Sequence, residues 1–261
     1  MAGPPTSEIG RDVDRLVIAV HRAVMTHHRP QLQDMVEMIG VTSPGHFYDL
    51  AEFLAVGACT VEIAKRRFRY EPDNAAEALI SELHDRRLVD DNLHPSEPLV
   101  QVIANILLWR AEAAANLWRT DLTTALCGAA EALPHASGPV AEAFRSLPEP
   151  TPAAHRLHHL LTGLRYARLD AHVAAWEEAG LSVTEIVALS AAVTSAPVSP
   201  TPESLVARGW LTAQGSATAE GRAARSTIET QTNSRCDALF DAITDRQQWL
   251  AAMGSLAPQD E

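Results

Sequence analysis

The sequence predicts a mainly α-helical protein made of two similar modules, and three observations support this prediction. Apolar residues recur with the 3.6-residue helical period along several long stretches. One order of elements (short helix, turn, helix, tight turn, long helix) occurs in each half of the chain. The two occurrences are related by a constant offset of 122 residues (205 minus 83), and a repeat with a steady offset is stronger evidence than any single element in it.

The chain before residue 60 is predicted to form three helices. An apolar stripe covers 9–26, and Pro30 is expected to end this helix because the residue before a proline avoids the helical region. A second helix is expected over 31–39. Ser43-Pro44 then fits the N-cap and the first position of a third helix, which is expected to stop near Gly57.

Residues 60–99 have the order of a winged helix-turn-helix, namely positioning helix, turn, recognition helix and wing. Thr60 is expected to cap the positioning helix, and the recognition helix is expected to end in 83–89. The hairpin-like stretch 90–92 supplies the turn of the wing. A long, alanine-rich helix is expected to follow over 98–133.

The second half is predicted to repeat this order. A long helix is expected over 152–180, and Ser182 takes the place of Thr60 as a cap. The stretch 205–211 corresponds to 83–89, and a wing turn and another long helix follow it. The sequence therefore predicts a mainly α fold with two tandem winged-helix modules, joined by long helices and carrying small β wings.

The predicted domains follow from this repeat. Five prolines and a glycine mark 134–152 as a linker. An N-terminal module with its long helix is expected over 1–133, and a C-terminal module over 153–261. A chain of 261 residues is long enough for two small domains of this kind.

Composition restricts the partners and the compartment. The formal net charge of −12 disfavours DNA unless the basic residues gather on one face, because non-specific binding depends on neutralising phosphates. The three cysteines lack C-x-x-C spacing and fit reduced thiols. The first residues contain no apolar leader, and no apolar run reaches the roughly 20 residues of a membrane helix. We therefore expect a cytoplasmic protein without a membrane partner.

Any DNA contact is expected from a basic stretch on the positioning helix of the first module. This stretch contains Lys65, Arg66, Arg67 and Arg69, while Asn74 at the start of the recognition helix could read a base edge. In the second module, prolines at 197, 200 and 202 are expected to shorten or break the recognition helix. The alternative is that the basic residues are solvated charges beside nearby glutamates.

Two stretches resemble a known family. Residues 203–233 resemble the end of a MarR-type winged-helix domain, with L-x-x-R-G-W-L, a wing glycine and T-x-x-G-R. Residues 164–181 match the frame L-R-x-x-R-x-D-x-H-V-A-A followed by A-G-L, and Val20-His21 matches a Val-His pair in the first helix. Together they are similar to actinobacterial MarR-like helix-turn-helix proteins with two modules. This resemblance implies transcription regulation and a homodimer formed through long helices.

A ligand pocket between the two modules is predicted from the helix over 152–180. Arg165, Arg168, His172 and Trp176 share one face of this helix, and the resemblance adds His21 and Asp170. Arginine forks bind carboxylates and tryptophan rings stack, so an anionic, partly aromatic small molecule is expected. The alternative is a polar network that ties the modules together, with His172 bonded to a carboxylate.

Two functions remain open from the sequence. The first is a winged-helix transcriptional regulator or small-molecule sensor. The second is a ligand-, metal- or haem-binding protein, with enzymatic activity left open, that uses the same fold without DNA. A metal or haem would bind through His21 or His172, whereas His155, His158 and His159 have metal-compatible spacing but fit a solvated face better. No nucleophile, phosphate-loop or metalloprotease motif indicates catalysis.

Overall fold

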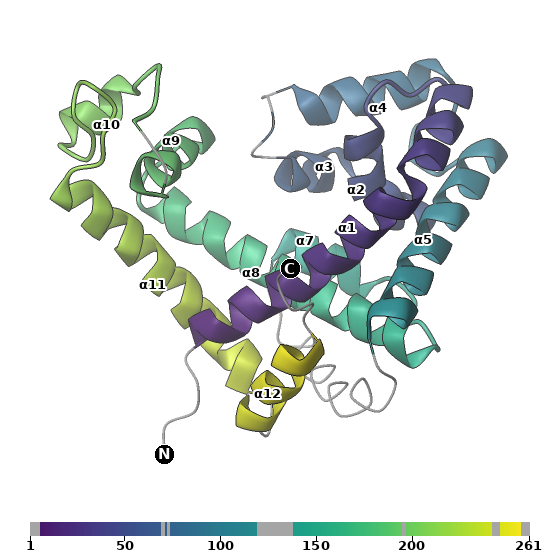
Figure 1. Cartoon of the computed structure of the whole chain (residues 1–261). Coiled ribbons are helices and arrows are strands. Elements are labelled where there is room, and N and C mark those ends of the chain that lie inside the picture. Colours follow the sequence, from purple (N-terminus) through teal and green to yellow (C-terminus); the bar gives the residue numbers. More distant parts are fainter. Residues whose placement is uncertain are drawn as a thin grey trace. The chain divides into compact units, whose positions relative to one another are not determined.

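The protein is mainly helical, as predicted. The computed structural model describes residues 6–68, 71, 74–118, 138–194, 197–241 and 246–256. Its helices are Thr6–Met38 (α1), Pro44–Ala55 (α2), Val61–Arg67 (α3), Ala75–Asp85 (α4), Glu97–Leu117 (α5), Pro139–Arg145 (α7), Ala153–Glu178 (α8), Val183–Thr194 (α9), Glu203–Ala207 (α10), Ala219–Asp241 (α11) and Arg246–Leu256 (α12) (Figure 1). Within these described residues, no helix is both long and apolar enough to cross a bilayer.

The chain forms two compact units. The first unit comprises Met1–Ala167 and Ala238–Glu261, and the second comprises Arg168–Asp237. The helix α8 contributes residues to both units. The division into domains at 134–152 stays a prediction, but this stretch is more than a linker, because it contains α7. The buried side chains of α7, among them Phe144, belong to the interior of the first unit.

The long helix α1 passes through Pro30, so the prediction that the helix ends there was wrong. Leu32 and Val36 continue the buried stripe of Val20 and Val24 beyond the proline, and α1 packs along α5. A proline inside a helix costs roughly 3 kcal/mol. Burying each of the two later aliphatic side chains contributes roughly 1.5–3 kcal/mol, so packing outweighs the local preference.

Two stretches of the chain, 60–96 and 182–218, share one set of backbone hydrogen bonds; we call them the first and second segments. Leu88 N donates to Leu83 O at 2.9 Å in the first segment, and Trp210 N donates to Leu205 O at 2.9 Å in the second. The bonds that close the wing turns correspond in the same way. Asp90 N donates to His94 O in the first segment, as Thr212 N donates to Ser216 O in the second. Ser96 N donates to Leu88 O in the first segment, as Thr218 N donates to Trp210 O in the second. All of these pairs are 122 residues apart (210 minus 88), which is the offset that the sequence predicts.

The predicted helix caps and wings appear in both segments, the wings in reduced form. Thr60 accepts a hydrogen bond from Ile63 N at 3.1 Å, and Ser182 accepts one from Glu185 N at 3.3 Å. Each wing is one isolated antiparallel bridge, Val89 with Pro95 and Leu211 with Ala217. No strand forms in the part of the chain that the structure describes, so the β wings amount to these bridges.

One helix end differs from the prediction, and one short helix agrees with it. The helix expected over 98–133 ends at Leu117, because Trp118 adopts an extended conformation with φ −117° and ψ 131°. The rest of that predicted helix, 119–133, lies outside the described residues. In the second unit, α10 has only five residues, as the prolines before it predict.

Candidate functional site

An arginine and a glutamate lie in the interior of the first unit. Arg110 of α5 is 2% exposed and donates from Nη1 to Glu52 Oε2 of α2 at 2.8 Å. Its Nη2 donates to the Tyr48 carbonyl oxygen at 2.7 Å, and the guanidinium carbon lies 4.2 Å from the centre of the Tyr48 ring. Burial disfavours the charged form, but the charge interactions with Tyr48 and Glu52 leave the pKa of Arg110 above its ordinary value. The cation is therefore a permanent part of the interior.

Tyr166 of α8 and Arg67 of α3 extend this ion pair. Tyr166 Oη donates to Glu52 Oε1 at 2.6 Å, and burial followed by the charge of Glu52 raises the pKa of Tyr166. Arg67 lies with its guanidinium carbon 5.5 Å from the centre of the Tyr166 ring and pairs with Asp49 at 3.1 Å. We call the following set the buried polar network: Arg110, Glu52, Tyr48, Tyr166, Arg67 and Asp49. It connects helices α5, α2, α8 and α3.

Two histidines lie against the buried polar network. The centre of the His21 ring is 5.4 Å from that of Tyr48 and 5.8 Å from that of His158. The His158 ring in turn lies 6.1 Å from the ring of Trp118. Burial, with Arg110 as the next cause, lowers the pKa of both histidines well below the ordinary value. Both imidazoles are therefore neutral at pH 7.

Polar atoms without hydrogen-bond partners are concentrated here. The buried atoms without a partner in this part of the first unit include His21 Nε2, Tyr48 Oη, Arg110 Nε, Trp118 Nε1 and His158 Nε2. A buried polar group without a partner costs about 1–3 kcal/mol, and native proteins retain few of them. Their gathering in one place indicates a site that another molecule completes.

A cavity of about 100 Å³ in the first unit is lined by two of these side chains, Arg110 and His158. Its polar lining includes Glu52, Arg110 and His158, and its apolar lining includes Phe144 and Leu147. Charged and neutral polar groups thus meet an apolar wall, which is the composition of a small-molecule site. His155 and His159 also line this cavity, and burial lowers the pKa of each, so these histidines are not part of a solvated face.

The ligand-binding residues predicted from the sequence are divided between the two units. In the first unit, which also contains His21, Arg165 pairs with Asp14 at 3.0 Å. The second unit holds Asp170, which is buried, and Trp176, which packs in an apolar cluster with Leu189. Trp176 therefore serves the core there.

Arg168 and His172 lie together in the second unit, on the helix α8. Arg168 Nη2 is 2.8 Å from Glu229 Oε2 of α11, and His172 Nδ1 is 3.7 Å from Glu229 Oε1. His172 Nδ1 also lies 3.0 Å from Thr232 Oγ1. These bonds connect α8 with α11 inside one unit, and they include the carboxylate near His172 that the network alternative predicts.

The predicted DNA-binding residues are mostly engaged by carboxylates. Lys65 pairs with Glu77 at 2.6 Å, and Arg66 pairs with Glu62 at 2.8 Å. Arg67, as described above, belongs to the buried polar network, so its charge is used inside the protein. Arg69 lies outside the described residues.

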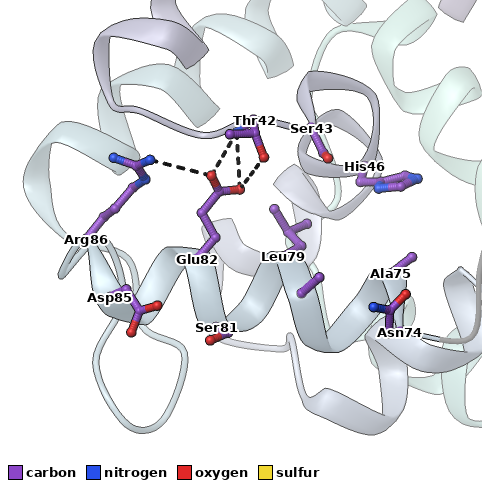
Figure 2. A pocket seen from close by; sticks show the side chains of 11 residues that line it. Thr42, Ser43, His46, Asn74, Ala75, Leu79, Ser81, Glu82, Asp85 and Arg86 are labelled. Atoms are coloured by element: carbon purple, nitrogen blue, oxygen red, sulfur yellow. Dashed lines mark hydrogen bonds and ion pairs between the residues drawn. The ribbon is translucent and has the colours of Figure 1, made fainter.

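A polar groove of about 670 Å³ runs along α4, with Asn74 at the start of the helix (Figure 2). Glu82 crosses this groove and accepts hydrogen bonds from Thr42 N at 3.0 and 3.1 Å and from Thr42 Oγ1 at 3.1 Å. Ser81 and Asp85 lie on the side of α4 away from Thr42 (Figure 2). The Glu82 carboxylate in this groove therefore already has hydrogen-bond partners, unlike the unpartnered atoms around Arg110 and His158.

Sequence reasoning missed Glu52, Arg110, Tyr48 and Tyr166. A signal was nevertheless present, since Glu52 stands inside the otherwise apolar run AEFLA and Arg110 directly follows the apolar run ILLW. A lone charge in such a run requires a buried partner. The partner lies 58 residues away, and no local spacing rule reaches that far.

No metal centre emerges from the side chains. Within the described residues, no three or more histidine, cysteine, aspartate or glutamate side chains are grouped so that they could hold a metal ion. The pair formed by His21 and His158 contributes two imidazoles without a third such ligand.

Comparison with known proteins identifies the family. A family model described as a helix-turn-helix family matches residues 11–258, nearly the whole chain. The search of curated proteins and the search of solved structures each gave no match.

Proposed function

The chain belongs to the helix-turn-helix family, and from this premise we propose that it is a transcriptional regulator that senses a small molecule. The ligand would bind at the buried polar network of the first unit, next to the cavity lined by Glu52, Arg110 and His158. One observation carries this proposal: Arg110 and His158 both line that cavity, and each has a buried nitrogen without a hydrogen-bond partner.

Stability alone is a poor reason to bury these charges. Replacing a buried ion pair with apolar residues of similar volume is often neutral or stabilising. Proteins also tend to break their own local rules at functional sites. A buried Arg110–Glu52 pair surrounded by unsatisfied groups therefore supports binding as the reason for its presence.

The buried polar network offers a route from the ligand to the helix-turn-helix. Glu52 accepts from Arg110 and from Tyr166, and Tyr166 lies under Arg67 at the end of α3. A ligand that takes a hydrogen bond from this set would alter the support of α3, which packs against α4. The ligand would then favour one arrangement of α3 and α4 over another, which is the differential contact that a sensor needs.

The DNA contact is expected to be weak and strongly dependent on salt. Lys65 and Arg66 would have to exchange Glu77 and Glu62 for phosphates. The net charge of −12 acts against the same contact. Asn74 is the residue at the start of α4 that is best suited to reading a base.

The second candidate is a ligand-binding protein of this family that does not bind DNA. The pairing of Lys65 and Arg66 with glutamates favours it, as does the length of α10, which has only five residues. A helix of five residues offers little surface to a major groove. The predicted homodimer stays a prediction under either candidate.

Binding to DNA fragments from the protein's own locus, at low and at physiological salt, separates the two candidates. For a regulator, the double variant Lys65→Ala/Arg66→Ala should weaken binding about tenfold and flatten the salt dependence. The matched control is Arg15→Ala on α1, where an exposed arginine pairs with Asp12 at 3.1 Å. Equal binding by all three proteins, or no binding at low salt, would support the candidate without DNA.

A further inference from the structure

We propose that the ligand of the first unit is a small aliphatic monocarboxylate, held by the unpartnered donors around Arg110 and His158 with its chain in the cavity that these two residues line. This inference rests on the proposed function, because it names the ligand class for the same site. Its basis is the number of unpartnered donors and the volume next to them.

The unpartnered atoms require acceptors more than donors. Arg110 Nε and Trp118 Nε1 carry hydrogens and can only donate. His158 Nε2 and Tyr48 Oη can also donate, depending on tautomer and rotamer. A carboxylate offers two oxygens with about four acceptor positions, and hydrogen bonds to an ionised acceptor are about twice as strong as neutral ones. An anionic acceptor therefore suits this cluster.

The surrounding charges nearly balance, so the free donors decide which ligand suits the site. Arg110, Arg165 and Arg67 lower the pKa of His21 after burial, and Arg110 and Arg165 also lower that of His158. Each of these guanidinium groups pairs with a carboxylate, namely Glu52, Asp14 and Asp49. Arg110 keeps its Nε free to donate, and this N–H favours an anionic acceptor over a metal ion.

The cavity limits the size of the ligand. Its volume of about 100 Å³ is below the 300–1,000 Å³ of sites for drug-sized molecules. An apolar cavity of about 150 Å³ takes benzene, so this space suits a molecule of roughly four to six non-hydrogen atoms. Val56, Leu107, Phe144 and Leu147 supply walls for a short hydrocarbon chain.

Isothermal titration calorimetry of the full chain with butyrate tests this inference. The matched neutral and cationic probes are butyramide and butylamine, which have similar shapes. Butyrate should bind roughly tenfold more tightly than butyramide, and butylamine should bind least. Benzoate should bind more weakly than butyrate, because its ring exceeds the cavity.

Two pairs of variants connect binding to the site. His158→Phe should abolish butyrate binding, whereas His28→Phe, at a ring stacked 4.7 Å from Trp109, should not. Trp118→Phe removes only one donor and should weaken binding several-fold, whereas Trp109→Phe should leave it unchanged. Circular dichroism melts establish that each variant is folded, and the tryptophan pair keeps the test valid if His158→Phe is not.

The outcomes separate this inference from the proposed function. Tighter binding of butyramide or butylamine at the same site would overturn the carboxylate assignment and leave the ligand site in place. Butyrate binding that survives both His158→Phe and Trp118→Phe would also overturn the assignment. If no probe of any charge binds or shifts the melting temperature, the ligand site fails as well.

Discussion

The first and second segments share a backbone frame but differ in what surrounds it. Gly57 and Gly180 precede them at φ +66° and +67°, 123 residues apart (180 minus 57), and this spacing places Ala175 where the first unit has Glu52. The offset of 122 places Leu189 where the first segment has Arg67. Ala175 and Leu189 are both 0% exposed, so the second unit buries apolar groups where the first buries charges.

This difference indicates which features the fold requires. The shared hydrogen bonds and turns form in both units, although only the first unit has charged residues at the positions of Glu52 and Arg67. Arg110 corresponds to Thr232 (232 minus 110), which lies 3.0 Å from His172 and makes a neutral contact in place of an ion pair. The frame is therefore independent of the buried polar network, and the network reflects a use that the second unit does not share.

The largest expected effect comes from breaking the ion pair of the first unit. Arg110→Met should lower the free energy of unfolding by about 3–5 kcal/mol, because Glu52 is left buried and charged. Urea denaturation measures the change. Arg15→Met, at an exposed pair with Asp12, should cost less than about 1 kcal/mol.

A double variant sharpens this result. Glu52→Leu/Arg110→Met makes the site apolar, as in the second unit, and should recover at least about half of the loss. A double variant no more stable than Arg110→Met would mean that the charges are needed for folding. The network could then no longer be interpreted as a purely functional addition.

A steric difference between the wing turns gives the next largest effect. Gly215 has φ +77°, and a Cβ there would lie 2.1 Å from Val198 O, whereas Leu93 holds the corresponding position of the first segment at φ +61°. Gly215→Ala should therefore destabilise the protein by about 1–3 kcal/mol. Gly209→Ala is the matched control, since φ is also positive but nothing lies within 4 Å. Equal melting temperatures for the two variants would contradict this explanation.

The frame could be predicted from the sequence because its signals are local. A cap or a turn depends on neighbours three or four positions away. The bonds of Thr60 and Ser182 are examples, since each side chain accepts from a backbone N–H three residues later. The same local reasoning ended α1 at Pro30, where the packing of α1 against α5 decides the outcome instead.

The candidate site could not be predicted in the same way. Its contacts join residues far apart in sequence, such as Glu52 with Arg110 and Tyr48 with His21. Arg67 illustrates the difficulty, since a basic run predicts an exposed surface, yet one member pairs inside with Asp49. Sequence patterns could detect that a charge was out of place but could not identify its partner.

The buried His158 and the half-buried His21 should make stability depend on pH. The pKa of His21 and of His158 is lowered in the folded state, so the unfolded chain binds more protons as pH falls below the ordinary value of about 6.5. Stability should therefore be complete above this pH and fall below it, by up to about 1.4 kcal/mol per pH unit for each histidine. Urea denaturation at a series of pH values measures this slope. The series should run from about one pH unit above the ordinary histidine pKa to about one and a half units below it.

Variants of His21 and His27 test whether this pH dependence of stability comes from the histidines with lowered pKa. His21→Phe should reduce the slope in the acid range, because the unfolded chain then gains one proton fewer relative to the folded state. His27→Gln, at an exposed position of the same helix, should retain it. A slope unchanged by His21→Phe would place the acid sensitivity elsewhere.

The smallest effects concern the caps, where the two segments should behave alike. Thr60→Ala and Ser182→Ala should each lower the free energy of unfolding by about 1 kcal/mol, because each side chain accepts from a backbone N–H of the first turn. Ser43→Ala is the control, since Ser43 precedes α2 without a side-chain cap bond and should change stability by less than about 0.5 kcal/mol. Thermal melts of the three variants test whether the frame is energetically equivalent in both halves. A loss at only one of the two caps would show that the shared hydrogen bonds carry different weight, and the contrast between the units would then include the frame itself.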